Sequence, residues 1–258
     1  MENSPSMASD KNLRDSFSLD GRVAIVTGAL GLLGRQHCMA LAEAGANVVV
    51  CDLDEENSKF FASGLTTRSI GAKADITNIN SVKALKHNIL QEFGRIDILV
   101  NNAAINDMVE NPMQAVNLSK FENYPVELFR KVIDVNVTGM FICSQVLGAE
   151  MLRQKKGSII NVASTYGIVA PDQSLYKKRD GTQSFYKSAA YPTAKGAVIT
   201  FTKFLAAYWG SSGIRVNSLS PGGVENHQDE HFVTNYSSRT PLNRMAQPAD
   251  YKGAMVCL

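Results

Sequence analysis

Short apolar runs alternate with longer segments of helical periodicity along most of this chain, from Arg22 onward. The runs are rich in valine and isoleucine and have the length of buried strands. Continuous apolar strands that alternate with helices indicate a doubly wound parallel sheet with helices on both faces. Strands are expected at 22–27, 47–52, 69–74, 96–100, 157–162 and 215–219, and the clearest helices at 34–44, 81–93, 126–153 and 189–208.

No second domain follows, so we expect one α/β domain at 18–258 behind a flexible N-terminal tail at 1–17. A hydrophobic content of 45% and a net charge of +2 are ordinary for a soluble domain and carry no signature of nucleic-acid binding. No uninterrupted apolar run reaches the length of a membrane span, and the tail lacks the apolar core of a secretory signal. Four scattered cysteines fit reduced thiols. We therefore expect a cytoplasmic protein without nucleic-acid or membrane partners.

A glycine-rich loop, Thr27-Gly-Ala-Leu-Gly-Leu-Leu-Gly34, joins the first expected strand to the first expected helix. In this context glycines at 28, 31 and 34 let the backbone turn tightly and approach a pyrophosphate at the helix N-terminus. The loop therefore predicts a Rossmann-like fold that binds a dinucleotide.

Asp52 ends the second expected strand, 18 residues after Gly34. A carboxylate at this place accepts hydrogen bonds from the adenosine ribose hydroxyls and repels a 2′-phosphate. The next residue, Leu53, is not an arginine that would attract that phosphate. These two residues predict NAD as the cofactor, in preference to NADP.

Tyr191 and Lys195 stand four residues apart in an expected helix, so they share one face of it. An ammonium at about 4 Å, at an effective dielectric of about 20, supplies the roughly 4 kcal/mol that lowers a phenol pKa by about three units. The pair therefore suits a proton shuttle. The spacing alone arises by chance about once in two chains of this composition, so the surrounding motifs decide its meaning.

In order and spacing, the motifs over 18–258 resemble those of the short-chain dehydrogenase/reductase family. The resemblance implies hydride transfer between a nicotinamide and an alcohol or carbonyl carbon. It makes Tyr191 the general acid/base, while Lys195 lowers its pKa and holds the nicotinamide ribose. The resemblance further implies that Ser164 polarises the substrate oxygen and that Asn136 shapes a helix bend beside a water chain.

The resemblance also implies a set of residues that contact the cofactor. Asp75 and Ile76 match the adenine side, and Pro221 and Gly222 match the turn at the nicotinamide. The full set is Gly28, Gly31, Leu32, Leu33, Gly34, Asp52, Asp75, Ile76, Asn102, Ala103, Tyr191, Lys195, Pro221, Gly222 and Val224.

Three departures from the family pattern concern details of cofactor geometry. The spacing of the glycine loop is that of the extended branch of the family, with Leu32 where single-domain members have their second glycine. Ala104 replaces the glycine of the Asn-Asn-Ala-Gly stretch, and Asn226 stands where a threonine is usual.

An insertion at about 168–189 separates Ser164 from Tyr191 by 27 residues, roughly twice the usual family distance, so it borders the active site. It combines lysines and arginine with aromatic residues, which suits a phosphorylated or nucleotide-linked sugar. A solvated lid with incidental charge is the alternative. The motif combination resembles family members of surface-polysaccharide and flagellin-glycan sugar pathways. The expected substrate contacts are Tyr166, Lys177, Lys178, Arg179 and Tyr186, with Lys187 adding charge.

His227-Gln-Asp-Glu-His231 fits a zinc-peptidase pattern, which requires a helix, a third ligand and an open metal position. Since it follows Pro221-Gly222, where the family has its substrate loop, we expect no metal here.

Several alternatives stay open from the sequence. The substrate class alternatives are a 3-oxoacyl thioester and a polyol. An alternative from a different functional class is a cofactor-binding protein that is inactivated by C-terminal truncation. We weigh it because family members usually have a seventh, C-terminal strand, which we expect to be absent from this sequence. Helices near 141–151 and 197–208 match those of the family's four-helix interface, so a homodimer or homotetramer is expected.

Overall fold

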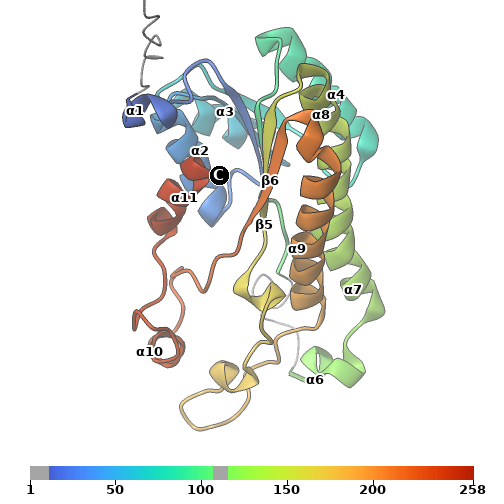
Figure 1. Ribbon diagram of the computed structural model, residues 1–258. Coiled ribbons are helices and arrows are strands. Elements are labelled where there is room, and N and C mark those ends of the chain that lie inside the picture. The colour runs from blue at the N-terminus through green and yellow to red at the C-terminus, as the bar shows by residue number, and fades with distance from the viewer. Residues whose placement is uncertain (1–11, 107–115) are drawn as a thin grey trace, which may run out of the picture.

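Six parallel strands form the central sheet of the computed structural model, which describes residues 12–106 and 116–258 (Figure 1). The strands are β1 (Val23–Thr27), β2 (Asn47–Asp52), β3 (Ile70–Lys73), β4 (Ile98–Asn101), β5 (Gly157–Val162) and β6 (Ile214–Leu219). Their order across the sheet is β3-β2-β1-β4-β5-β6. The order reverses between β1 and β4, and open parallel sheets bind ligands outside the carboxyl ends of the strands at such a point. The predicted Rossmann-like fold is confirmed.

Helices cover both faces of the sheet (Figure 1). One face carries α1 (Leu13–Ser16), α2 (Leu32–Glu43), α3 (Glu55–Ser63) and α11 (Lys252–Cys257). The other carries α4 (Ile79–Phe93), α7 (Val126–Ile133), α8 (Met140–Gln154) and α9 (Ala190–Trp209). Two short helices, α6 (Val116–Ser119) and α10 (Glu230–Ser237), lie beyond the carboxyl ends of the strands, at the bottom of Figure 1.

Alternate strand residues supply two apolar clusters, one on each face of the sheet. Ile25 and Leu99 belong to the cluster that includes α4, α8 and α9, whereas Val26 and Val100 belong to the cluster that includes α2 and α11. Successive strand side chains point to opposite faces, so a strand buried on both faces must be apolar throughout. This double burial explains why the strands are unbroken apolar runs in the sequence.

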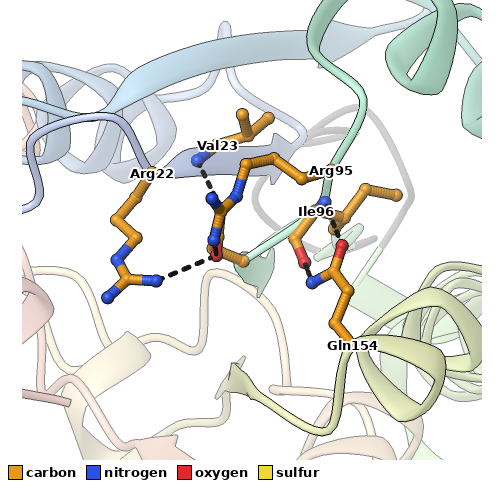
Figure 2. A network of polar contacts seen from close by, with 6 residues as sticks. Arg22, Val23, Arg95, Ile96 and Gln154 are labelled. Carbon is orange, nitrogen blue, oxygen red and sulfur yellow. Dashed lines mark hydrogen bonds and ion pairs between the residues drawn. The ribbon is translucent and has the colours of Figure 1, made fainter.

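A buried carboxylate, that of Asp97, ties together the amino ends of β1 and β4, and Figure 2 labels its partners Arg22, Val23 and Arg95. Its oxygens accept hydrogen bonds from the Val23 N–H at 2.9 Å and from the guanidinium groups of Arg22 at 3.3 Å and Arg95 at 2.6 Å. The network therefore stabilises the end of the sheet that is opposite the carboxyl ends of the strands.

A side-chain contact at the same end of the sheet explains why β4 starts later than predicted. The Gln154 side chain accepts a hydrogen bond from the Ile96 N–H at 3.1 Å and donates one to the Ile96 carbonyl at 2.6 Å (Figure 2). Because the side chain engages both backbone groups of Ile96, the strand begins at Ile98, two residues after the expected start.

The segment predicted as one helix at 126–153 is continuously helical, but it contains one turn of π-helix. A π-helical turn at Asp134–Gly139 joins α7 to α8. Such turns occur mostly as single-turn bulges inside α-helices, frequently at functional sites. The sequence periodicity predicted the continuous helical segment but not the π-helical turn within it.

Val126–Gln154 is long and apolar enough to cross a membrane by length and composition, although no uninterrupted apolar run in the sequence indicated this. More than half of its most apolar stretch is buried inside the fold. Buried core helices of soluble proteins share this length and composition, so the segment Val126–Gln154 is only weak support for a membrane span.

The predicted N-terminal tail overlaps the start of the described chain. Its residues Leu13–Ser16 form α1, one turn of helix, and residues 1–11 lie outside the described residues.

Candidate active site

A cavity of about 840 Å³ opens beyond the carboxyl ends of the strands. Its walls come from the turn after β5, the start of α9, the segment 175–187 and the loop after β6. Ser164, Tyr191 and Lys195 line this cavity, as predicted. Asn136 is buried and is not among the residues that line it. The fold therefore brings three of the four expected catalytic side chains to one surface.

Tyr191 and Lys195 occupy successive turns at the start of α9. The Lys195 ammonium lies 5.6 Å from the centroid of the Tyr191 ring and donates a hydrogen bond to the Val162 carbonyl at 2.7 Å. Lys195 is only 4% exposed, and this burial lowers its pKa to about 8. While it is protonated, the ammonium beside the ring favours the phenolate form of Tyr191.

Ser164 begins the 3-10 turn at Thr165–Gly167, just after β5. Its Oγ accepts a hydrogen bond from the Tyr166 N–H at 3.1 Å. The turn is held against the loop after β6, because the Thr165 N–H donates to the Pro221 carbonyl at 3.0 Å. The bond to Tyr166 uses a lone pair of the Ser164 oxygen, so its hydroxyl proton can be donated to a ligand oxygen.

Asn136 lies in the π-helical turn and joins it to the loop after β4. Its Oδ1 accepts from the Ile105 N–H at 2.8 Å, and its Nδ2 donates to the Ile105 carbonyl at 3.0 Å. The side chain thus replaces a backbone partner for Ile105, which fits the bend-shaping role that the resemblance implied.

Close backbone approach requires glycine at two positions of the glycine loop. A Cβ at Gly28, where φ is +60°, would lie 2.6 Å from the Ala103 Cα, and a Cβ at Gly34 would lie 2.2 Å from the Gly28 carbonyl oxygen. At Gly31 the nearest atom would be 3.3 Å away, which leaves more room. The result is a tightly turned, glycine-rich cradle at the N-terminus of α2, which fits the pyrophosphate of a dinucleotide.

Asn102 and Thr27 fix this cradle to the end of β4. The Asn102 Nδ2 donates to the carbonyls of Thr27 at 3.0 Å and Gly28 at 2.9 Å. The Thr27 Oγ1 accepts from the N–H groups of Asn102 at 3.1 Å and Ala103 at 3.2 Å. Asn102 and Ala103 therefore shape the expected cofactor site through the glycine loop that they support.

Asp52 ends β2 with its carboxylate beside the glycine loop. One oxygen accepts from the Leu30 N–H at 2.9 Å and the other from the Leu53 N–H at 2.8 Å. Each oxygen keeps a further lone pair for a ribose hydroxyl, and the negative charge disfavours a phosphate at the same place. The contact with Leu30, which the sequence did not reveal, gives Asp52 a second task in holding the loop.

Asp75 and Ile76, the expected adenine-side pair, lie outside the cavity. The Asp75 carboxylate accepts from the N–H and the hydroxyl of Thr77 at 2.9 and 2.7 Å. The Ile76 side chain is buried and packs on the π-helical turn, where a Cβ at Gly139 would lie 2.6 Å from its Cδ1. Its side chain is therefore committed to the core.

The other expected cofactor residues divide between the cavity and the cradle. Those that line the cavity are Leu32, Leu33, Asn102, Tyr191, Lys195, Pro221, Gly222 and Val224. Those outside its lining, besides Asp75 and Ile76, are Gly28, Gly31, Gly34, Asp52 and Ala103.

The insertion forms one wall of the cavity and is joined to α10. Gln173–Tyr176 is a 3-10 turn, and Lys177 pairs with Gln183 in an antiparallel bridge. Arg239, just after α10, contacts Asp172 of the insertion at 3.1 Å. This ion pair is exposed and contributes little energy, but it holds the insertion close to α10.

Inside the cavity, aromatic rings of the insertion pack against aromatic rings of α10. Tyr176 packs on Phe185 and Phe232, with centroids 4.8 and 5.8 Å away, and Phe232 packs on Tyr236 at 5.9 Å. The hydroxyls of Tyr166 and Tyr176 are 3.1 Å apart, and burial raises the pKa of both phenols. The wall therefore offers neutral rings and hydroxyls. Our sequence reasoning missed the two α10 rings, whose four-residue spacing on a short helix was the available signal.

The predicted basic contacts lie at the mouth of the cavity. Lys177, Lys178 and Arg179 line it but are exposed, and the Arg179 guanidinium lies 3.8 Å from the Glu230 carboxylate of α10. Tyr166 also lines the cavity, whereas Tyr186 lines a neighbouring hollow of about 510 Å³.

Lys187 lies deeper than the other cations of the insertion. It is 5% exposed, its Nζ is 4.7 Å from the centroid of the Tyr191 ring, and it donates a hydrogen bond to the Asn106 side-chain oxygen. Counting it with the charges at the mouth was wrong, because the chain folds back and buries it against Tyr191. Nothing in the sequence distinguishes it from Lys177 or Lys178.

The zinc-peptidase pattern is not assembled as a metal site. His227 precedes α10 with a φ of +58°, and the His231 ring contacts the Asn235 amide at 3.0 Å. In residues 12–106 and 116–258, no group of three His, Cys, Asp or Glu side chains is placed to hold a metal ion.

Comparisons with known proteins match nearly the whole chain. A family profile described as "Enoyl-(Acyl carrier protein) reductase" matches residues 28–258. D-threitol dehydrogenase of Mycolicibacterium smegmatis is 34% identical over 208 residues, which cover 80% of this chain and 71% of that protein. A 3-oxoacyl-(acyl-carrier-protein) reductase of Synechocystis is 32% identical over 247 residues, which cover 92% of this chain and 89% of the relative.

A solved structure shows the same architecture. The crystal structure of a gluconate 5-dehydrogenase from Burkholderia cenocepacia, in complex with NADP and tartrate, matches with a TM-score of 0.81 and 29% sequence identity. The match covers 96% of this chain and 91% of that chain.

Proposed function

This chain belongs to the short-chain dehydrogenase/reductase family, and we propose that it uses NAD to oxidise or reduce a sugar derivative that carries a phosphate or a nucleotide. Family membership makes it a nicotinamide-dependent oxidoreductase that acts on alcohol and carbonyl groups. The observation that carries the proposal is one cavity in which Ser164, Tyr191 and Lys195 meet a basic and aromatic insertion.

Each of the three catalytic candidates that line the cavity has a separate role in the reaction. When bound, a nicotinamide supplies the hydride donor or acceptor for the substrate carbon. Tyr191 takes the hydroxyl proton during oxidation and returns it during reduction. Lys195 favours the phenolate form, and its bond to Val162 fixes the ammonium in place. Ser164 donates its hydroxyl proton to the substrate oxygen and so orients it towards Tyr191.

The preference for NAD rests on Asp52. Its carboxylate lies beside the glycine loop, and the next side chain is the exposed Leu53 rather than a cation. A 2′-phosphate would meet this negative charge without a compensating arginine. The related gluconate 5-dehydrogenase structure contains NADP, so similarity to this family does not itself decide between the two cofactors, and the proposal of NAD rests on Asp52 and Leu53.

The substrate class rests on the insertion. Lys177, Lys178 and Arg179 line the mouth of the cavity, and Tyr176 and Phe185 supply rings within it. Cations at the mouth suit a phosphate that stays near solvent, and aromatic rings suit a sugar or base deeper inside. The names of the relatives give no support to a role in surface-polysaccharide or flagellin-glycan pathways, so that role stays a prediction.

A neutral polyol is the second candidate substrate. Two observations favour it: Glu230 lies close to Arg179 and offsets part of the charge at the mouth, and one relative is a D-threitol dehydrogenase. A 3-oxoacyl thioester is favoured only by the name of the reductase relative.

The test is a substrate panel read by NADH absorbance, with sugar phosphates and nucleotide sugars set against polyols of the same carbon skeleton. We expect kcat/KM to be at least about tenfold higher for a phosphorylated substrate. The double variant Lys177→Gln, Lys178→Gln should lose that advantage. Equal kcat/KM values for the neutral polyol would reject the charged substrate class and leave the polyol candidate.

Assembly and location are also proposals. Phe141, Phe204 and Tyr208 are exposed on α8 and α9, and the last two stack with centroids 5.7 Å apart. Such a face supports a homodimer or homotetramer, which light scattering can measure. The free thiols of Cys38, Cys51, Cys143 and Cys257 support a reducing compartment such as the cytoplasm.

A further inference from the structure

The ring of Tyr191 contacts two lysines. The Nζ of Lys195, on the following turn of α9, lies 5.6 Å from the ring centroid, and the Nζ of Lys187, just before α9, lies 4.7 Å from it. Both lysines are buried, at 4% and 5% exposure. The nearer of the two cations is therefore the one that the insertion supplies.

The insertion holds Lys187 in place through its backbone. The Gln173 side chain accepts from the Lys187 N–H at 2.8 Å and donates to the Lys187 carbonyl at 3.1 Å. Gln183 in turn donates to the Gln173 carbonyl at 2.9 Å and to the Phe185 carbonyl at 2.8 Å. Gln173 thus holds the Lys187 backbone, and Gln183 holds Gln173 and Phe185. The backbone at Lys187 therefore has little freedom to move away from Tyr191.

The ammonium of Lys187 is also fixed at its tip. It donates to the Asn106 side-chain oxygen, which belongs to the segment after β4. Backbone and tip are thus held by different parts of the chain, and the charge stays over the ring. Such a buried, fixed charge is screened much less than the exposed cations at the mouth.

We propose that Lys187 is a positioning residue that acts through Tyr191, as a second cation that favours its phenolate form. The negative charge of a phenolate spreads over the ring, so a fixed ammonium 4.7 Å from the ring centroid stabilises it. This proposal deepens the proposed function and rests on Tyr191 being its acid/base. It assigns the insertion a role in the chemistry, in addition to any role in binding substrate.

Other titratable groups share the cavity, and they differ from Lys187 in charge or in depth. Phenols carry no positive charge in either protonation state, and the lysines, the arginine and the aspartate lie at the exposed mouth. They are Tyr166 and Tyr176 of the insertion wall, Tyr236 of α10, and Lys177, Lys178, Arg179 and Asp229.

The test is the ultraviolet tyrosinate titration of Tyr191 itself, obtained by subtracting the titration of the Tyr191→Phe protein from that of each parent. It needs neither cofactor nor substrate. In Lys187→Gln we expect the Tyr191 step to move about one to two pH units higher, and Lys187→Arg should restore it. Lys156→Gln is the matched control, because Lys156 is exposed and precedes the amino end of β5, at the end of the sheet opposite the site. A Tyr191 step that stays in place in Lys187→Gln overturns the proposal.

Kinetics separate this role from substrate binding. The acid limb of kcat/KM for alcohol oxidation should shift with the tyrosinate step in Lys187→Gln. A loss confined to KM for anionic substrates, with an unmoved pH profile, would instead make Lys187 a substrate ligand and reject the proposal. If no substrate is turned over, the proposed function fails, and the absorbance titration still decides the role of Lys187.

A second variant covers the case in which Lys187→Gln does not fold. Gln173→Leu keeps the lysine and removes the two side-chain bonds that hold its backbone. A partial upward shift of the Tyr191 step supports the proposal, and an unshifted step counts against it.

Discussion

The Lys195 ammonium donates a hydrogen bond to the Val162 carbonyl at 2.7 Å and so joins the start of α9 to the end of β5. Tyr191 lies on that helix, and Ser164 follows that strand by two residues. One buried charge therefore sets the position of Tyr191, the proposed acid/base, relative to the hydroxyl of Ser164, the proposed substrate contact. The catalytic geometry depends on a tertiary contact as well as on the four-residue spacing within the helix.

The pKa of Lys195 predicts the alkaline limit of activity. Burial lowers this pKa to about 8, so the ammonium loses its proton as pH rises through that value. The part of the electrostatic support for the Tyr191 phenolate that Lys195 supplies is then lost. We expect kcat/KM for alcohol oxidation to level off or fall above about pH 8, as a pH–rate profile of the free enzyme would show. In Lys195→Arg, which keeps its charge, this alkaline limb should vanish; the same limb in that variant would assign it to another group.

Gly34→Ala should damage the cofactor cradle more than Gly31→Ala. The new Cβ would lie 2.2 Å from the Gly28 carbonyl oxygen in the first variant and 3.3 Å from the same atom in the second. Overpacking of this kind costs about 1–3 kcal/mol. Thermal melting should show the loss for Gly34→Ala, and fluorescence titration with NADH should show weaker binding. Equal effects at the two positions would contradict the close approach of α2 to the loop.

Asp52→Asn combined with Leu53→Arg should shift the cofactor preference towards NADP. The asparagine keeps an acceptor for the Leu30 N–H, while the change removes the charge that repels a 2′-phosphate and adds one that attracts it. We expect the NAD to NADP ratio of kcat/KM to fall by about ten- to a hundredfold, or about 1.4 to 2.8 kcal/mol. Leu53→Arg alone serves as the control for a general gain of positive charge. An unchanged ratio in the double variant would remove Asp52 from cofactor selection.

His37 makes the fold sensitive to acid. It is 0% exposed on α2, and neither ring nitrogen has a hydrogen-bond partner among the described residues. Burial lowers its pKa from 6.5 to about 4. Below pH 6.5 the unfolded chain therefore binds more protons than the folded one, and stability falls as pH drops towards 4. The loss attributable to His37 is about 2 kcal/mol between pH 7 and pH 5.

Chemical unfolding at these two pH values measures that loss. His37→Leu should reduce the pH dependence by about 2 kcal/mol, whereas the exposed His87→Gln on α4 should leave it unchanged. The same pH dependence in His37→Leu and the parent would assign the acid sensitivity to other groups.

The sequence predicted the architecture well because the strands are buried on both faces. The bounds of β2 and β5 match the expected runs, since each is an apolar segment between polar or glycine-containing turns. The start of β4 was missed because a distant side chain, Gln154, engages the Ile96 backbone. Helical periodicity continues through 134–139, so the π-helical turn left no trace in the pattern of apolar residues.

The candidate site was predicted only where its members form local motifs. Helical spacing predicted that Tyr191 and Lys195 share one face, the surrounding motifs predicted their role, and the glycine loop was recognised from its place between a strand and a helix. The burial of Lys187 depends on Gln173, fourteen residues earlier, and on Asn106 in another segment. A charge count along the insertion cannot reveal such a contact, because the same residue type lies at the exposed mouth in Lys177 and Lys178.

The central claim is that Tyr191 is the acid/base of a nicotinamide-dependent oxidoreductase. Its most direct test is NADH formation by the parent protein and by Tyr191→Phe on the substrate panel, with NADH binding to both followed by fluorescence. We expect equal binding and a loss of turnover of at least about a hundredfold in the variant, the lower bound for general acid/base catalysis. Turnover retained in Tyr191→Phe, or a parent protein that binds NADH and turns over no substrate, would contradict the account.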